Sequence, residues 1–212
     1  MMTLSQHLAH VRKLDLGCGA TPQPGYVGLD AAVHAPVEGR EVWQLNLATG
    51  DPWPLSDEQV TDLYSSHLIE HLPAQDVRAH QFVDAAGARS KVPGLQRYHR
   101  EQDALFWFMD ECWRICVPGA RFELRWPALV DLRESAERPD HPPRWLVAPF
   151  MDPTHRRFIP VETLAYFDRC QREEAGLSGY AVSCDWVLVD LLVGILGCGH
   201  LENIAILEKR AT

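Results

Sequence analysis

A short glycine-containing turn is the first place in this sequence where the residue types could serve a ligand. Leu14-Asp15-Leu16 reads as the end of a strand, and Gly17-Cys18-Gly19 follows at once. Because glycine has no Cβ, a ligand can approach the backbone closely at such a turn. A second apolar segment, Tyr26 to Leu29, ends on Asp30. A carboxylate at that strand end can accept hydrogen bonds from both hydroxyls of a ribose.

The same turn lacks what a dinucleotide needs. Pro22 stands where the third glycine of a dinucleotide-binding fingerprint would be, and Ala20 to Gly25 cannot hold a full helix. Without that helix no N-terminus is available to bind a pyrophosphate. The pattern therefore favours a ligand with a ribose and no pyrophosphate, a description that S-adenosyl-L-methionine meets and NAD does not.

A second group of chemically capable residues follows the apolar segment Val60 to Ser65. His67-Leu68-Ile69-Glu70-His71 spells the inverted zinc-protease motif H-x-x-E-H. A zinc site of that kind needs these residues on one helix, with both histidines on one face. The motif instead starts at a strand end, and Pro73 comes two residues after it. A zinc-dependent hydrolase acting through His67, Glu70 and His71 stays as an alternative, but we expect no metal here.

The elements that must position these residues alternate between strands and helices, which predicts an α/β fold with a mostly parallel sheet covered on both faces. Apolar residues recur at helical spacing over Asp103 to Cys116, and a second helix is expected to begin near Pro160. Pro73 to Gln102 is polar and reads as an insertion, and Arg133 to Pro153, with five prolines, as an extended surface loop. The predicted strands are Lys13 to Leu16, Tyr26 to Leu29, Val42 to Leu47, Val60 to Ser65, Arg121 to Trp126, Ala181 to Val189 and Asn203 to Leu207.

Length and composition narrow the classes of protein. The 212 residues fit one domain, 1–212, with the insertion at about 73–102. A net charge of −9 makes nucleic acid an unfavourable partner, because such binding needs clustered Lys and Arg. No signal peptide and no membrane-spanning stretch is visible, which predicts a cytoplasmic protein. The six cysteines form no Cys-x-x-Cys pair and are expected to be reduced. The oligomeric state is left open.

The order of these motifs resembles the class I S-adenosylmethionine-dependent methyltransferases, and in particular a group of short, largely uncharacterised members. Leu14 to Gly19 and Pro24-Gly25-Tyr26-Val27-Gly28-Leu29-Asp30 are similar to the first two strands of that group and their exits. Asp62 to Leu72 is similar to the fourth strand and its exit, and Glu111 to Ala120 to the helix and turn before the fifth strand. The resemblance implies a Rossmann-like methyltransferase fold of seven strands, here with a shortened first helix and an insertion after the fourth strand.

The resemblance also implies where a cofactor would bind. Asp15, Gly17, Cys18 and Gly19 would surround the methionine end of S-adenosyl-L-methionine, and Asp30 would hold the ribose. Asn46 and Leu47 would lie along the adenine, with Ser66 and His67 at the end of the fourth strand. Asn46 stands where the family commonly has an acid, and Ala120 where it has a second glycine.

The acceptor side rests on fewer residues. Asp152, His155 and Arg156 follow the proline-rich loop and offer a carboxylate, an imidazole and a guanidinium, which suits a small-molecule acceptor with an anionic group. His67 and His155 are the candidate bases, needed only if the acceptor carries a proton of high pKa. The alternative from another class is a non-catalytic module that binds S-adenosylmethionine or S-adenosylhomocysteine.

Overall fold

A computed structural model of the chain describes residues 3–32, 34, 39–73, 76–83, 96–128, 152–177, 180, 182–195 and 201–211. For 76–83, 96–102 and 195 it describes the backbone only. Most of the predicted loop from Arg133 to Pro153 lies outside these ranges.

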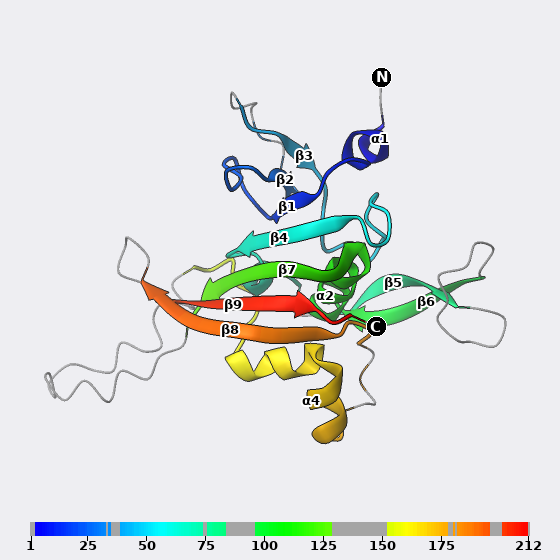
Figure 1. The fold of residues 1–212 in the computed structure, drawn as a ribbon, viewed down its shortest axis with the longest axis vertical. Helices are drawn as coiled ribbons and strands as arrows, with labels where there is room; N and C mark the ends of the chain where they lie inside the picture. Colours follow the sequence, from blue (N-terminus) through cyan, green and yellow to red (C-terminus); the bar gives the residue numbers. More distant parts are fainter. Residues whose placement is uncertain are drawn as a thin grey trace, which may run out of the picture.

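A seven-stranded mixed sheet organises the described residues, in the order β3-β2-β1-β4-β7-β9-β8 (Figure 1). Parallel pairing joins the strands from β3 to β7, whereas β9 is antiparallel to both of its neighbours. The seven strands and the mostly parallel pairing are confirmed. The strands are β1 (Lys13–Leu16), β2 (Val27–Asp30), β3 (Val42–Gln44), β4 (Val60–Ser66), β7 (Cys116–Pro127), β8 (Trp186–Ile195) and β9 (Leu201–Lys209).

The strand order reverses between β1 and β4. From β1 the chain adds β2 and β3 on one side, and β4 then pairs with the other side of β1. In open α/β sheets, ligands bind outside the carboxyl ends of the strands at such a reversal. The glycine turn follows β1 and His67 follows β4, so both predicted groups lie at this position.

The helices that the structure describes are short. α1 (Leu4–Leu8) begins at a capping box of Thr3 and Gln6, and α2 (Ala104–Ile115) begins where the carboxylate of Asp103 accepts a hydrogen bond from the Leu105 N–H. The predicted helix over Asp103 to Cys116 is thereby confirmed. Between β1 and β2 the described backbone holds turns and no helix, as the short Ala20–Gly25 segment predicted.

The single helix predicted near Pro160 is divided into two helices in the structure. The chain forms a 3-10 helix, η4 (Val161–Phe167), and then α4 (Arg169–Glu174). Asp168 between them is extended, with φ −99° and ψ 120°, and its carboxylate accepts hydrogen bonds from the N–H groups of Cys170 and Gln171. Asp168 thus ends one helix and caps the next, which a continuous apolar stripe could not reveal.

Several strand boundaries also differ, and β7 begins at Cys116 and not at the predicted Arg121. The predicted strand over Val42 to Leu47 stops at Gln44, where its partner β2 ends at Asp30. The strand predicted from Ala181 begins at Trp186 and runs on to Ile195, because β9 offers pairing along that whole length.

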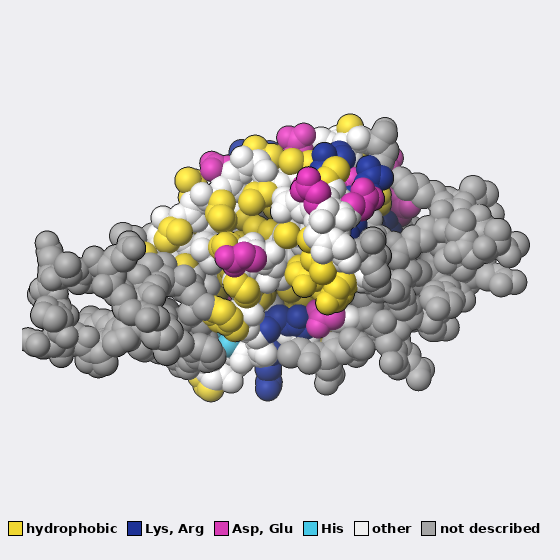
Figure 2. All heavy atoms as spheres, turned by 90° about the horizontal axis from the view of Figure 1, so that it is seen from below, with side chains coloured by type: hydrophobic (Ala, Val, Ile, Leu, Met, Phe, Trp, Pro, Cys, Tyr) yellow, Lys and Arg dark blue, Asp and Glu magenta, His cyan; other side chains and the backbone are white. Residues whose placement is uncertain are grey.

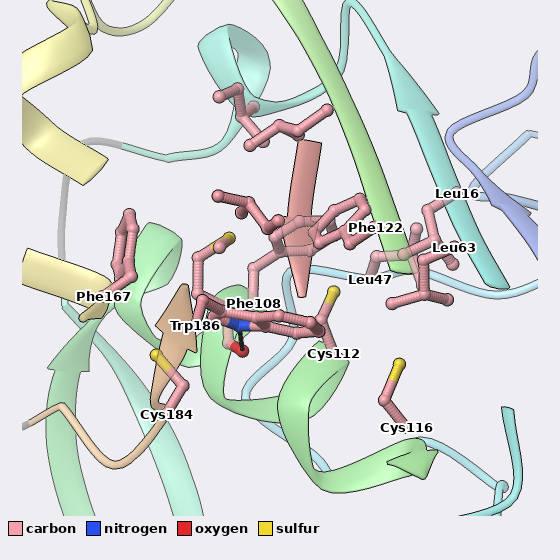
Figure 3. Close-up of a cluster of buried hydrophobic side chains, with 14 of the residues drawn as sticks. Leu16, Leu47, Leu63, Phe108, Cys112, Cys116, Phe122, Phe167, Cys184 and Trp186 are labelled. Atoms are coloured by element: carbon pink, nitrogen blue, oxygen red, sulfur yellow. Dashed lines mark hydrogen bonds between the residues drawn. The ribbon is translucent and has the colours of Figure 1, made fainter. Parts of the chain in front are cut away.

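One continuous core lies between the helices and one face of the sheet. The predicted stripe of α2 is fully buried, and Phe108 meets Phe122 of β7 with ring centroids 6.4 Å apart (Figure 3). The indole N–H of Trp186 donates to the carbonyl of Met109. Leu8 of α1 and Phe167 of η4 belong to the same cluster. Within the described ranges the helices therefore cover this face, while Lys13, Asp15, Tyr64, Glu123 and Arg125 lie on the other.

The predicted insertion contains an antiparallel hairpin, β5 (Asp76–Val83) and β6 (Gln96–Asp103), which forms its own two-stranded sheet (Figure 1). No strand was predicted there, because the segment is polar and lacks a sustained apolar alternation. The division of the chain into one domain with this insertion stays a prediction.

The edge strand β8 exposes hydrophobic side chains, namely Val189, Leu191, Leu192 and Val193. Figure 2, seen from below relative to Figure 1, shows hydrophobic side chains gathered among polar ones on that side. Among the described helices, none has the length and apolar character that crossing a bilayer requires.

Candidate cofactor and acceptor site

The glycine turn is held close to β2 and to the exit of β4. The N–H of Gly17 donates to the carbonyl of Leu29, at 2.8 Å, and φ of Gly17 is +71°. A Cβ at Gly17 would come within 2.8–3.0 Å of three carbons of Leu68. Gly19, with φ +57°, has no described atom within 4 Å of the Cβ position. The turn therefore packs tightly at Gly17 and opens at Gly19, where a ligand can approach the backbone.

Asp30 connects the end of β2 to this turn. Its Oδ2 accepts a hydrogen bond of 2.8 Å from the Gly19 N–H, and its Oδ1 accepts one of 2.8 Å from the Ala32 N–H. Nε2 of His34 lies 3.1 Å from Oδ1. Burial alone raises the pKa of Asp30, but the bonds from Ala32, His34 and Gly19 together lower it. The carboxylate is therefore ionised, and its remaining lone pairs can accept hydroxyl hydrogens.

Asp15 lies beneath the turn and is almost fully buried. Its Oδ2 accepts a hydrogen bond of 2.7 Å from the Gln23 N–H. Burial raises the pKa of Asp15 to about 6, and the nearby Asp30 adds to this. Burial and the same two carboxylates raise the pKa of Cys18 to about 12, so its thiol stays protonated and is no nucleophile. A buried carboxyl group with an unbalanced charge suits a cationic ligand group.

Of the two residues expected along the adenine, Asn46 is exposed and Leu47 is buried. Oδ1 of Asn46 accepts a hydrogen bond from the Ala48 N–H, closing a local turn. Leu47 is 4% exposed and is a member of the hydrophobic core. Leu47 is thus a packing residue in this structure, while Asn46 is the more accessible of the two. Ser66 ends β4 and is half-buried.

His67 lies between two buried carboxylates directly after β4. Its Nδ1 is 3.2 Å from Oε1 of Glu70, and its Nε2 is 3.3 Å from Oε2 of Glu202 on β9. The hydrogen bond to Glu70 raises the pKa of His67 against the opposing effect of burial, and Glu202 adds to the rise. Its φ of +55° is rare for a side chain with a Cβ. The two carboxylates favour the protonated form of His67, and a protonated imidazole cannot accept a proton as a general base.

The segment from Asp152 to Arg157 is fixed against the short turn of Ile69–His71 that follows β4. The N–H groups of Arg156 and Arg157 both donate to the carbonyl of Glu70, at 2.7 and 3.2 Å. The Arg157 guanidinium donates to both carboxylate oxygens of Asp103 and to the carbonyls of Leu72 and Pro73. These contacts bring the predicted acceptor residues next to the exit of β4.

The structure thus brings His67 and His155 into one group through Glu70. Nε2 of His155 is 4.0 Å from Oε1 of Glu70 and 3.9 Å from Oδ2 of Asp152. The rings of His155 and His71 meet edge to face, with centroids 4.7 Å apart. The side chain of Arg156 is exposed. The H-x-x-E-H helix does not form, because only Ile69–His71 turns, as the 3-10 helix η1, and His67 precedes it.

Sequence reasoning missed Glu202 and Arg125. Nη1 of Arg125 donates to Oε1 of Glu202, and the same guanidinium binds Glu123 through two hydrogen bonds. Glu202 lies one residue before the predicted strand Asn203 to Leu207, so the sequence carried no signal that this acid is buried and needs a partner. Its partner could not be read from the sequence, because β9 pairs with β7 from a distance along the chain.

Comparison with known proteins gives no match in sequence, neither to a family model nor to a curated protein. Solved structures match in fold. A putative methyltransferase from Bacillus halodurans matches with a TM-score of 0.51 and 10% identity, over 98% of this chain and 97% of its own. An S-adenosylmethionine-dependent methyltransferase from Mesorhizobium loti matches with a TM-score of 0.50 and 10% identity, over 95% and 92%.

The chain has the class I methyltransferase fold. The order and direction of its seven strands agree with that assignment, and the predicted fold class is confirmed. The fold alone does not fix the reaction, because the [4+2]-cyclase SpnF also matches, with a TM-score of 0.51 and 10% identity over 96% of this chain and 76% of its own.

Proposed function

We propose that this methyltransferase-fold protein transfers a methyl group from S-adenosyl-L-methionine to a small-molecule acceptor. The observation that carries the proposal is the bond between the Gly19 N–H and Oδ2 of Asp30. It places an ionised carboxylate beside an open glycine turn, at the reversal of the strand order where α/β sheets bind ligands.

The side chains around the glycine turn would suit a nucleoside that carries a cationic group. Asp30 would accept hydrogen bonds from the ribose hydroxyls, and Gly17, Cys18 and Gly19 would line the methionine portion. Asp15, buried and with a raised pKa, would gain a balancing charge from an α-ammonium group. The pocket would be completed by Asn46, Ser66 and His67. Leu47 would support it only through packing in the hydrophobic core.

When bound, S-adenosyl-L-methionine supplies a methyl group that its sulfonium has already activated. The protein must then mainly hold the acceptor atom in line with that methyl group, and alignment of this kind contributes on the order of 7–11 kcal/mol. Asp152, His155 and Arg156 are the proposed acceptor residues, because the Glu70 carbonyl fixes their segment at the carboxyl edge of the sheet. His155 is the preferred base, since His67 is engaged by two carboxylates.

A module that binds the cofactor without turning it over is the second candidate. The fold similarity to a [4+2]-cyclase is the observation that favours keeping it, because that protein uses this fold for other chemistry. Consumption of labelled S-adenosyl-L-methionine separates the two candidates. The net charge of −9 favours a small acceptor over nucleic acid.

Calorimetry with S-adenosyl-L-methionine, S-adenosylhomocysteine and NAD tests the cofactor assignment. We expect the first two to bind and NAD not to bind. Asp30→Asn keeps an acceptor oxygen for one of the two backbone N–H groups and loses both the charge and the second acceptor, so cofactor affinity should fall by roughly 1.5–3 kcal/mol. Asp190→Asn, at an exposed position on the edge strand β8, is the matched control and should bind like the wild type. Equal affinity in Asp30→Asn and the control would overturn the assignment of the ribose site.

A further inference from the structure

Glu70, His71 and His155 place one carboxylate oxygen and two imidazole nitrogens within 4.8 Å of one another. His71 belongs to the short turn η1, while His155 comes from a segment more than eighty residues later in the chain. From this grouping we propose that the protein binds a divalent transition-metal ion, such as Zn²⁺ or Mn²⁺, through Glu70, His71 and His155.

The ligand chemistry defines the class of ion. Imidazole nitrogens suit zinc and the first-row transition metals, while one carboxylate adds a harder oxygen donor. Metal–ligand distances of about 2.0–2.2 Å require the three donor atoms to approach one another further than they do here. Small side-chain rotations supply that approach, because the three atoms already surround one point.

Glu70 itself points to a missing partner. Its side chain is 3% exposed, and Oε1 lies between Nδ1 of His67 at 3.2 Å and Nε2 of His155 at 4.0 Å. Its other oxygen, Oε2, is buried and has no hydrogen-bond partner among the described residues. An unsatisfied buried carboxylate oxygen is costly, and a bound cation would satisfy it.

The surrounding contacts hold the ligands in place, as metal sites require. Nδ1 of His71 lies 3.1 Å from Oγ1 of Thr154, which donates to Oδ1 of Asp152 at 2.6 Å. The carbonyl of Glu70 is bound by the N–H groups of Arg156 and Arg157. Each ligand is therefore tied to the backbone or side chain of the segment that carries another ligand.

This set is distinct from the one expected in the sequence. The sequence motif paired His67 with His71, whereas in the structure His67 is bound to Glu70 and Glu202 and stands beside the group. The helical H-x-x-E-H geometry is replaced by a turn plus a distant histidine, which does not depend on a helix continuing toward Pro73.

The ion would lie beside the proposed cofactor pocket, since Leu68, two residues before Glu70, packs against Gly17. With the ion bound, His155 is a ligand and no longer the base, because its ring nitrogen is coordinated. Three protein ligands leave a coordination position for an oxygen atom of an acceptor, and binding there would instead lower the pKa of a hydroxyl group. This role rests on the proposed methyl transfer, whereas the binding of the ion does not.

Metal titration of the chelator-treated full-length protein tests the site directly. We expect calorimetry with Zn²⁺ or Mn²⁺ to show one ion per chain, and Co²⁺ to give the visible absorption bands of a protein-bound ion. His71→Ala and His155→Ala should each weaken binding at least about tenfold. His10→Ala, at an exposed histidine outside the group, is the matched control and should bind as the wild type does.

Cofactor binding and thermal melting of each variant separate the outcomes. Loss of metal with unchanged melting and unchanged S-adenosylhomocysteine affinity supports the site. Metal affinity equal in the wild type, His71→Ala and His155→Ala would overturn it, as would no binding to the wild type. If His71→Ala fails to fold, Glu70→Gln, which keeps the shape of the side chain and removes its charge, tests the same ligand set. Failure of the cofactor titration alone would count only against the proposed function.

Discussion

Nε2 of His67 lies 3.3 Å from Oε2 of Glu202, so side chains 135 residues apart join the exit of β4 to β9. The other oxygen of Glu202 accepts a hydrogen bond from Arg125 on β7. Glu202 is thereby engaged by the Arg125 guanidinium and the His67 imidazole while only 5% of its side chain is exposed. This carboxylate holds three strands in register at the edge where the candidate site lies.

Replacing this carboxylate should therefore lower stability. We expect Glu202→Gln to reduce the free energy of unfolding by about 1–3 kcal/mol, because it removes the charge that faces Arg125 and His67. Glu208→Gln on the same strand is the control, since Glu208 is exposed. Urea denaturation measures both variants, and equal midpoints would show that the buried carboxylate contributes nothing particular.

Asp15 should give the stability a pH dependence of known sign. Its pKa in the folded protein is raised to about 6 from 3.8, mainly by burial. Below about pH 4 the group is protonated in both states and costs nothing, whereas above about pH 6 its ionised form destabilises the folded state. Asp15→Asn should therefore raise stability by about 2–3 kcal/mol near pH 8, with the gain vanishing near pH 4. Thermal melts across this range, with Asp190→Asn as control, test the sign.

The same substitution separates stability from binding. If Asp15 balances the α-ammonium group of the cofactor, Asp15→Asn should bind S-adenosyl-L-methionine more weakly although it melts at a higher temperature near pH 8. A variant that gains stability and keeps full affinity would leave Asp15 without a role toward the cofactor.

The sequence predicted the sheet well, because the relevant patterns are local. The strands β1, β2 and β4 are short apolar runs with clear ends, and the apolar stripe of α2, from Leu105 to Cys112, repeats at helical spacing. The glycine turn and Asp30 were equally readable, since a strand end followed by glycine or an acid is a local signal. Their bond through the Gly19 N–H is the outcome of two adjacent parallel strands.

The group around Glu70 could not be predicted in the same way. His155 and Glu202 reach it from segments far along the chain, and their approach depends on how η1, the Asp152 segment and β9 pack together. The hairpin β5–β6 was missed for a different reason, because its strands are polar and carry no apolar alternation. Its two strands satisfy their backbone hydrogen-bonding groups by pairing with each other, and such pairing cannot be recognised from composition.

Gly17 should tolerate no side chain. A Cβ there would meet Leu68 at 2.8–3.0 Å, and φ is +71°. We expect Gly17→Ala to cost about 1–2 kcal/mol for the backbone conformation and about 1–3 kcal/mol more for the displaced Leu68. Gly119→Ala, with φ +77° and no described atom within 4 Å, should show only the first cost. Denaturant midpoints compare the two, and equal losses would mean that Leu68 moves freely.

Arg156 and Arg157 are adjacent residues with opposite expected roles. The side chain of Arg156 is exposed, and its backbone N–H donates to the Glu70 carbonyl. Arg156→Ala should therefore change the free energy of unfolding by no more than about 0.5 kcal/mol and leave cofactor affinity intact. If Arg156 binds the acceptor, transfer of label from S-adenosyl-L-methionine into extracts of the native host should be lost.

Arg157 is instead 13% exposed and donates to Asp103 and to two carbonyls, so Arg157→Ala should destabilise the fold by about 2–4 kcal/mol. Thermal melts and the label assay on both variants decide between the roles. Arg156→Ala with full transfer would remove it from the acceptor site, and an unchanged melt of Arg157→Ala would show that its contacts do not hold the segment.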